Sequence, residues 1–199
     1  FVLLSKCNFV VEAITQGVDI LVNIDSDGQF DPKHIPSLLE PIITEKVDFV
    51  TASRFLNDRK IDMPIIKRWG NRQIAKIVSR LSDQKIHDVS CGFRAYARKA
   101  FLHLSLIGNF TYTHEVILTL AFKGFVIKEV YVPVRGTREF GESRVASSLF
   151  KYAFHAMAII IRCYRDYNPI MAFGLPGIIM TSVGLLLFTI FFICSFIQG

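Results

Sequence analysis

Residues 18–30 read VDILVNIDSDGQF, and this stretch decides the fold class. Residues 18–24 form a short, mostly apolar run rich in β-branched side chains, which is typical of a buried strand in a parallel sheet. Two carboxylates, Asp25 and Asp27, come directly after this run. In open α/β sheets, ligands bind outside the carboxyl ends of the strands. The stretch therefore predicts a strand of an α/β sheet with an acidic site at its end.

Strand and helix patterns alternate outward from this stretch. Strand patterns occur at 47–52, 92–96 and 126–134, and helix patterns occur at 32–45, 65–81, 98–104 and 113–122. The first of these helices opens with Asp31-Pro32, a favourable pair for an N-cap and the first helical position. The alternation predicts an α/β domain with a mostly parallel sheet.

The composition separates a charged part of the chain from an apolar tail. The 199 residues include 23 Lys and Arg against 17 Asp and Glu, which gives a net charge of +6. No charged residue follows Asp166. The chain is too apolar to be disordered, and its four cysteines are too widely spaced for a zinc cluster or a disulfide framework. We therefore expect a globular domain joined to a membrane-seeking segment.

Residues 177–197 predict a transmembrane helix. They are uncharged and crowded with Leu, Ile and Phe, and a helix of this length spans about 31 Å, close to the ~30 Å hydrocarbon core of a bilayer. A core helix that is apolar on every face would need a larger protein to cover it. Because the basic residues precede the span, the positive-inside rule predicts that the globular domain lies on the cytoplasmic face.

The segment at 147–167, before the predicted span, mixes cations with aromatic residues. Its small and apolar residues recur at spacings of three and four, as on one face of a helix: Leu149, Ala153, Ala156, Ile160 and Cys163. Such a helix would lie in the membrane interface or pack on its own domain. The predicted division is a globular domain at 1–145, an amphipathic juxtamembrane helix at 146–168 and a transmembrane segment at 169–199.

The carboxylates of Asp25 and Asp27 repel each other unless a positive group lies between them. A hard divalent cation with oxygen ligands meets this need. An EF-hand loop starting at Asp25 is excluded, because Phe30 and Pro36 stand where that loop requires Gly and Glu. A phosphatase that uses one acid of Asp-x-Asp as its nucleophile and a solvated acidic turn remain as alternatives.

Five sequence motifs resemble, in order, those of family 2 glycosyltransferases. They are IDSDGQFDP, TASRF, HDVSCGFRAYARKA, FTYTHE and EVYVPVRGTREFGESRV. The chain is most similar to the branch of dolichol-phosphate mannosyltransferases and bacterial polyprenyl-phosphate glycosyltransferases, and the match covers nearly its whole length. The resemblance implies a GT-A fold, a nucleotide-sugar donor, Mg²⁺ or Mn²⁺, and an inverting transfer of the sugar to a polyprenyl (dolichyl or undecaprenyl) phosphate.

The resemblance places Asp25, Asp27 and Gln29 in the motif that binds the metal and the donor diphosphate. The metal would neutralise the charge that grows on the diphosphate as the sugar–phosphate bond breaks. Asp27 and Asp88 are the implied catalytic residues. Arg54 matches a position near the donor phosphates, and an ordinary surface arginine is the alternative.

Asp88, Arg94 and Glu115 match positions around the sugar and the acceptor. Asp88 would be the general base for a hydroxyl acceptor, or it would orient the sugar, since a polyprenyl phosphate is already anionic. Some relatives carry an acid where Gly92 stands, which leaves the base assignment open. Arg94 either anchors its loop or contacts substrate. Glu115 either contacts the acceptor or is a helix-start carboxylate favoured by the helix dipole.

Four residues of the segment RGTREFGESR match phosphate-binding positions: Arg135, Arg138, Ser143 and Arg144. Several positive charges next to the membrane suit the acceptor phosphate or the donor diphosphate. Contact of the same residues with anionic lipid is a compatible alternative.

Other functions are weighed against this interpretation. A processive polysaccharide synthase is rejected, because its Gln-x-x-Arg-Trp motif lies downstream of the late acidic motif, whereas Arg68-Trp69 precedes Glu115 and follows Ile65. A membrane-anchored scaffold or an inactive homologue stays an alternative. The family's opening strand and acid, which hold the nucleotide base, have no counterpart in 1–17, so we expect the chain to be a fragment. No nucleic-acid partner is expected, and a homo-oligomer is left open.

Overall fold

The computed structural model describes residues 8–25, 28–56, 65–104, 112–134 and 149–198. The chain divides into two compact units, Phe1–Ile160 and Ile161–Gly199. Five of the predicted site residues lie outside the described ranges, so the structure gives no account of them: Asp27, Arg135, Arg138, Ser143 and Arg144.

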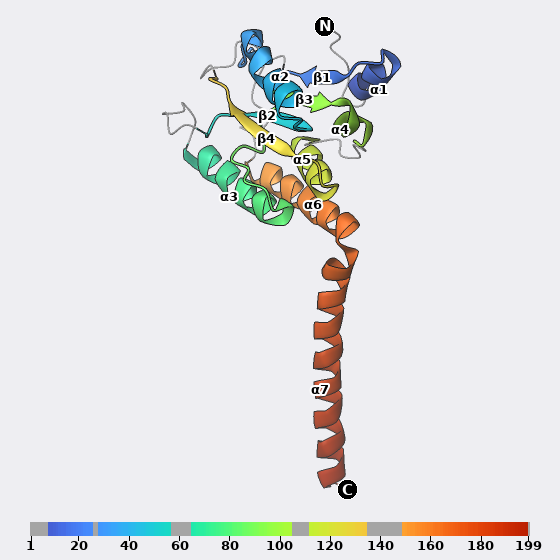
Figure 1. Cartoon of the computed structure of the whole chain (residues 1–199). Coiled ribbons are helices and arrows are strands. Elements are labelled where there is room, and N and C mark those ends of the chain that lie inside the picture. The colour runs from blue at the N-terminus through green and yellow to red at the C-terminus, as the bar shows by residue number, and fades with distance from the viewer. Residues whose placement is uncertain (1–7, 26–27, 57–64, 105–111, 135–148, 199) are drawn as a thin grey trace. The chain divides into compact units, whose positions relative to one another are not determined.

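Within the described residues, a four-stranded sheet forms the centre of the first unit (Figure 1). The strands are β1 (Ile20–Asn23), β2 (Phe49–Ser53), β3 (Arg94–Ala97) and β4 (Ile127–Tyr131), in the spatial order β1-β3-β2-β4. β3 pairs antiparallel with both β1 and β2, and β2 pairs parallel with β4. The strands β1, β2 and β4 therefore run in one direction, and β3 runs against them.

The α/β prediction is confirmed, but the expected mostly parallel sheet is corrected to a mixed one. Two of its three pairings are antiparallel, although three of its four strands share a direction. The reason is that a short strand buried on both faces shows the same apolar run in either direction. The reversal has a consequence for the site: the beginning of β3 lies at the edge where β1 and β2 end.

The helices follow the predicted pattern closely. Their bounds are α1 (Asn8–Thr15), the 3₁₀ turn η1 (Pro32–His34), α2 (Ile35–Thr44), α3 (Ile65–Ser82), α4 (Arg98–Leu102), α5 (Tyr112–Phe122), α6 (Leu149–Tyr167), the π-helical turn η2 (Ile170–Gly174) and α7 (Leu175–Gln198). The expected cap is present, because the Asp31 side chain accepts a hydrogen bond from the Lys33 amide at 3.0 Å. Two of these elements were not predicted as helices, α1 and the π-helical turn η2.

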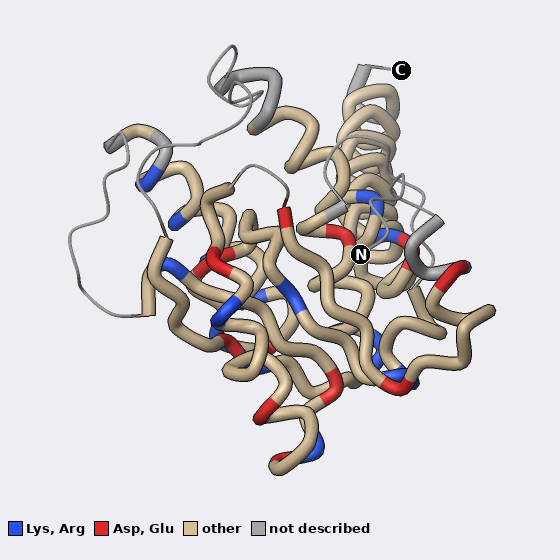
Figure 2. The backbone as a smooth tube through the Cα atoms, turned by 90° about the horizontal axis from the view of Figure 1, so that it is seen from above, with Lys and Arg blue, Asp and Glu red and all other residues tan. Residues whose placement is uncertain are grey.

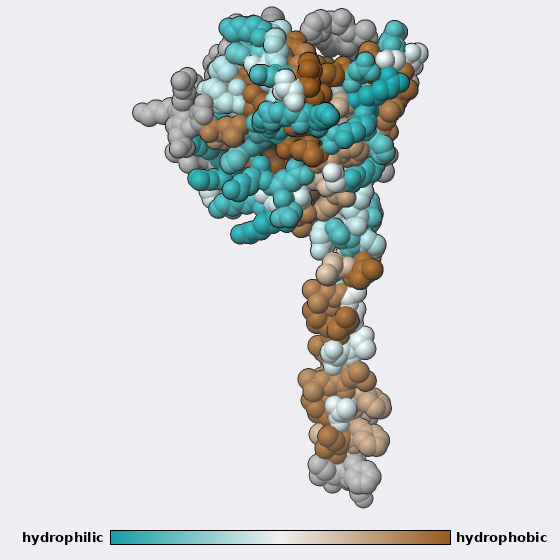
Figure 3. All heavy atoms as spheres, viewed as in Figure 1, coloured by the Kyte–Doolittle hydropathy of each residue, from teal (hydrophilic) through white to brown (hydrophobic). Residues whose placement is uncertain are grey.

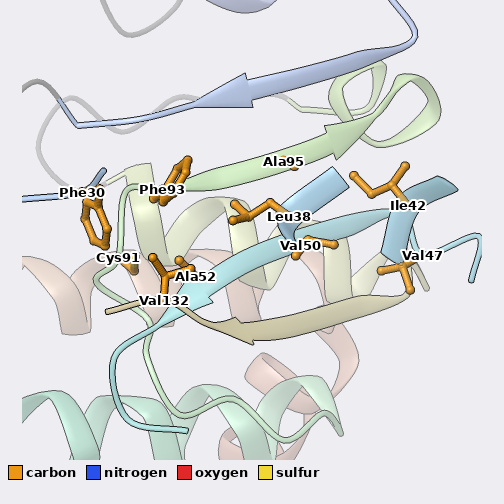
Figure 4. Packing of buried hydrophobic residues seen from close by; sticks show 10 residues of the cluster. All are labelled: Phe30, Leu38, Ile42, Val47, Val50, Ala52, Cys91, Phe93, Ala95 and Val132. Atoms are coloured by element: carbon orange, nitrogen blue, oxygen red, sulfur yellow. The ribbon is translucent and has the colours of Figure 1, made fainter. Parts of the chain in front are cut away.

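The core lies where α2 packs on the sheet (Figure 4). Leu38 and Ile42 of α2 meet Val50 of β2 and Ala95 of β3 in one buried cluster. Burying each large apolar side chain of this kind contributes about 1.5–3 kcal/mol. Alternate residues of a strand face opposite ways, so Phe49 points away from this cluster. Its ring centroid lies 4.9 Å from that of Tyr96, and the two ring planes are tilted by 45°. Both faces of the central strand β2 are therefore covered.

The helix α6 buries one stripe of side chains. Ala156, Ile159 and Ile160 are buried, whereas Phe154 and Met157 are exposed. This burial supports the alternative that the helix packs on its own domain. The predicted location of this segment in the membrane interface stays a prediction.

The second unit contains a helix that is long and apolar enough to cross a membrane. The candidate span is Ile170–Ser195, with a mean hydropathy of 2.4 and no buried residues. Figure 3 shows hydrophobic side chains along the described part of α7. The sequence between Leu175 and Gln198 contains no Lys, Arg, Asp or Glu, the residues coloured in Figure 2. By length and composition, the predicted transmembrane helix is confirmed as a candidate.

Candidate active site

Asp25 lies where β1 ends, in close contact with Gly92 just before β3. A Cβ atom built on Gly92 would lie 2.1–2.3 Å from the carboxylate atoms of Asp25. Asn23, the last residue of β1, donates from its amide Nδ2 to the Gly92 carbonyl at 2.9 Å. The carboxylate thus occupies the space that any other side chain at position 92 would fill. Glycine is required here for space, so that the two segments can approach.

The Asp25 carboxylate and the nearby sequence position Gln29 have the chemistry that suits a hard divalent cation. Asp25 and Gln29 offer carboxylate and amide oxygens, the donors that Mg²⁺ and Mn²⁺ prefer. The Asp25 carboxylate lies against Gly92, at the carboxyl end of β1, where a ligand is expected. Within the ranges that the structure describes, no group of three or more His, Cys, Asp or Glu side chains could hold a metal. The predicted third ligand, Asp27, lies outside those ranges.

Arg54 and Asp88 form a bidentate ion pair at the same edge. The Arg54 Nε donates to Asp88 Oδ2 at 2.6 Å, and its Nη2 donates to Oδ1 at 2.8 Å. Ser90 adds two hydrogen bonds to Oδ1, from its backbone N–H and its hydroxyl, both at 3.1 Å. The Asp88 side chain is fully buried, and that of Arg54 is 15% exposed. The guanidinium is therefore held in one orientation at the end of β2.

The surroundings of Asp88 keep it ionised. Burial alone would raise the pKa of this carboxyl, but the charge and hydrogen bonds of Arg54 and the amide of Ser90 together lower it below its ordinary value of 3.8. A general base works best when its pKa lies near the working pH. A carboxylate with a lowered pKa and with its oxygens occupied by donors suits an orienting role better than that of a base. The assignment of Asp88 as a catalytic residue stays a prediction.

Arg94 and the residues at the start of α5 are buried near the Arg54–Asp88 pair. The Arg94 side chain is fully buried and donates to the carbonyls of Cys91 at 2.7 Å, Thr113 at 3.2 Å and Val89 at 3.4 Å. These contacts support the anchoring role that was one of its two interpretations. Burial and the charge of Arg94 lower the pKa of His114 to about 4, so its imidazole is neutral at pH 7. Glu115 is buried in the first turn of α5, where the helix dipole favours a carboxylate.

A basic cleft of about 480 Å³ lies beside the ion pair. One wall is α3, whose Arg68, Arg72, Lys76 and Arg80 stand four residues apart and so share one face of the helix. The cleft is also lined by Lys85, by Phe55, which follows Arg54, and by His87, which precedes Asp88. Among the described residues that line the cleft, five are lysine or arginine and none is a carboxylate, which favours an anionic ligand. The sequence carried this signal in the repeated four-residue spacing of cations, which the apolar pattern of the helix obscured.

A comparison with protein families now places the chain. The family described as glycosyl transferase family 2 matches residues 8–104. Just under half of the chain therefore matches a glycosyltransferase family 2 domain. All the strands described above except β4 lie within the matched residues, as do Asp25, Arg54 and Asp88.

Two curated relatives extend the similarity of this family 2 domain. A UDP-N-acetylglucosamine–dolichyl-phosphate N-acetylglucosaminyltransferase of Methanococcus voltae is 34% identical over 95 residues, which cover 47% of this chain and 38% of the relative. Glycosyltransferase AglJ of Haloferax volcanii is 28% identical over 187 residues, which cover 91% of this chain and 60% of the relative. The chain therefore spans less than two thirds of the length of either relative.

The solved structures confirm the GT-A-like fold of the family 2 domain. Glucosyl-3-phosphoglycerate synthase from Mycobacterium tuberculosis, in complex with Mn²⁺, UDP and phosphoglyceric acid, matches with a TM-score of 0.52 and 16% identity. The match covers 75% of this chain and 49% of that chain. Identity this low supports the fold alone.

Several residues that organise the site were not found from sequence. Asn23 ties β1 to Gly92, Ser90 braces Asp88, and Glu129 of β4 accepts hydrogen bonds from the backbone of His87 and Asp88. Each of these contacts joins residues far apart in the chain or lies within a loop. No periodic pattern marks such positions, and only the HDVSCG motif, which contains Asp88 and Ser90, could have drawn attention to one of them.

The lowered pKa of Asp88 predicts a loss of stability in acid. A carboxyl whose folded pKa is lowered stabilises the fold above its unfolded pKa and loses this contribution as the pH falls through the folded value. The free energy of unfolding should therefore decrease as the pH falls below about 3.8, the ordinary pKa of the carboxyl. Asp88→Asn should lower stability at pH 7 but flatten this acid dependence, measured by urea unfolding at several pH values.

A matched control is Asp19→Asn, whose side chain is 93% exposed and should leave the acid dependence as in the wild type. The buried His114 also lowers stability in acid, and because the charge of Asp88 raises the pKa of His114, Asp88→Asn should lower that pKa further, whereas Asp19→Asn should leave it unchanged. An unchanged acid dependence in Asp88→Asn would show that Asp88 is not the group responsible.

Proposed function

We propose that this chain is part of a membrane-anchored glycosyltransferase that moves a sugar from a nucleotide-sugar donor to a polyprenyl phosphate, with inversion at the sugar. One observation carries the proposal. The basic cleft opens directly beside the Arg54–Asp88 pair, because Phe55 and His87, the chain neighbours of that pair, line it. The lysine and arginine side chains of the cleft, which could bind a phosphate, thus lie next to the sheet edge at which β1 ends and the acidic motif begins. A relative whose name specifies dolichyl phosphate supports this choice of acceptor.

Each residue would have a defined task in the transfer. A divalent cation held by Asp25, Asp27 and Gln29 would neutralise charge on the leaving diphosphate. Arg54, fixed by Asp88, would present a preoriented guanidinium to a phosphate, which stabilises developing charge without reorganisation during the reaction. A polyprenyl phosphate is anionic at neutral pH and needs no base, in agreement with the lowered pKa of Asp88. Direct attack on the face of the sugar opposite the diphosphate would invert the anomeric centre.

The remaining predicted residues fit the same scheme. Arg135, Arg138, Ser143 and Arg144 would bind the donor diphosphate or the acceptor phosphate. The membrane would hold α7, and the lack of any charged residue after Asp166 leaves the basic residues on the cytoplasmic face by the positive-inside rule. The hydrophobic acceptor would then lie in the same membrane that anchors the enzyme.

The test is a transfer assay on the full protein in membranes. Labelled UDP- and GDP-sugars are supplied with polyprenyl phosphate and Mg²⁺ or Mn²⁺, and label in the lipid phase is measured. We expect one donor to label the lipid only when both metal and acceptor are present, and the product to have the anomeric configuration opposite to that of the donor. A chelator and omission of the lipid are the controls. Absence of transfer from every donor by a folded, membrane-bound protein would instead favour the scaffold, and a retained configuration would contradict inversion.

A further inference from the structure

Glu129 of β4 is held against the turn that carries Asp88. Its Oε1 accepts the backbone N–H of Asp88 at 2.8 Å and that of His87 at 3.0 Å. Its Oε2 lies 2.6 Å from the ring Nδ1 of His87. The Glu129 side chain is only 4% exposed. Hydrogen bonds to an ionised carboxylate are about twice as strong as neutral ones, and they strengthen further away from water. This contact is therefore a firm attachment of the turn to the sheet.

Through this attachment, both members of the ion pair are connected to the same two strands, β2 and β4. Glu129 is opposite Thr51 in the parallel pairing of β4 with β2, and Arg54 follows the end of β2. Asp88 reaches Arg54 from the turn that Glu129 holds. The paired strands β2 and β4 thus hold the backbone of Arg54 and the turn that carries Asp88 in place relative to each other.

We propose that Glu129 is a positioning residue, which fixes the Asp88 carboxylate and through it the guanidinium of Arg54. Without Glu129, the two amides of the turn lose their acceptor, and the position of the Asp88 carboxylate depends more on its contacts with Arg54 and Ser90. The phosphate-binding consequence rests on the proposed function, in which Arg54 meets a phosphate. The structural consequence, a fixed Asp88, does not depend on it.

Hydrogen exchange of the full protein in detergent tests the structural consequence. The backbone N–H groups of Arg54 and Ser90 donate to the carboxylate of Asp88. If Glu129 positions Asp88, Glu129→Ala should raise exchange by about tenfold or more at Arg54 and Ser90 as well as at His87 and Asp88. Glu129→Gln, whose amide oxygen can still accept from the turn, should give a smaller increase. If Glu129→Ala does not fold, exchange is compared between Glu129→Gln and the wild type instead.

The control is Glu45→Ala, which removes a carboxylate from an exposed pair with Lys128, the neighbour of Glu129 on β4. Its exchange at Arg54 and Ser90 should match that of the wild type. If neither Glu129 variant exceeds this control at Arg54 and Ser90, Asp88 is located without Glu129 and the proposal is overturned.

A double-mutant cycle tests the effect on transfer. Glu129→Ala should lower kcat/KM about tenfold in the wild type but less than about twofold in an Asp88→Asn background, because residues that act through one another are not additive. Equal losses in the two backgrounds would show a general structural role and overturn the positioning role. If the wild type transfers no sugar, the proposed function fails, and the exchange data alone decide on Glu129.

Discussion

Replacing Gly92 with alanine is expected to lower sugar transfer by about a hundredfold or more while the chain stays folded. The added Cβ would lie 2.1–2.3 Å from the carboxylate atoms of Asp25, so Asp25 must move by an ångström or more. A displacement of about 1 Å in a catalytic arrangement can lower the rate by about a hundredfold, which corresponds to about 3 kcal/mol of transition-state stabilisation. The measurement is kcat/KM for lipid labelling, with near-ultraviolet circular dichroism as the check on folding.

Two further variants make the result specific to the contact between Gly92 and Asp25. Gly70→Ala adds the same methyl group inside α3, where a Cβ meets nothing within 4 Å, and should retain activity while stabilising the helix by up to about 1 kcal/mol. Asp25→Asn should lower transfer as strongly as Gly92→Ala, and the double variant should be little worse than either. Full activity in Gly92→Ala would mean that the position of Asp25 is unimportant for the reaction.

The parts of this site that the sequence predicts are those encoded in neighbouring residues. The apolar run before Asp25 predicts a strand, which is β1, and Asp31-Pro32 predicts a cap, which the Lys33 amide completes. The uncharged run that becomes α7 is equally local. Hydrophobic periodicity and capping depend on residues within a few positions of one another, so one sequence is enough to identify them.

The direction of β3 and the pairing of Arg54 with Asp88 could not be predicted in this way. β3 is a four-residue strand between β1 and β2, and its alternation is the same when the strand is reversed. Arg54 and Asp88 lie 34 positions apart, so each was assigned its own role near substrate. Their mutual contact depends on the reversal of β3, which brings the turn before that strand to the edge where β2 ends.

Removing the guanidinium with Arg54→Ala should destabilise the fold by about 3–5 kcal/mol, because it leaves the fully buried Asp88 carboxylate without a countercharge. For a chain of this size the melting temperature should fall by about 10 °C. Arg54→Lys keeps the charge but cannot form both hydrogen bonds at once, so we expect an intermediate loss. Combining Arg54→Ala with Asp88→Asn should restore much of the stability, since no buried charge is then left unpaired.

Transfer separates the two tasks of Arg54. Because the guanidinium is proposed to meet a phosphate, the stabilised double variant should stay at least about a hundredfold less active than the wild type. Lys128→Ala is the control for loss of an ion pair, since its partner Glu45 is half exposed and such pairs contribute less than about 1 kcal/mol. If Arg54→Ala melts as Lys128→Ala does, the pair does not hold the site together. If the double variant regains wild-type transfer, Arg54 serves the fold alone, and the phosphate must be bound by the cations of the cleft.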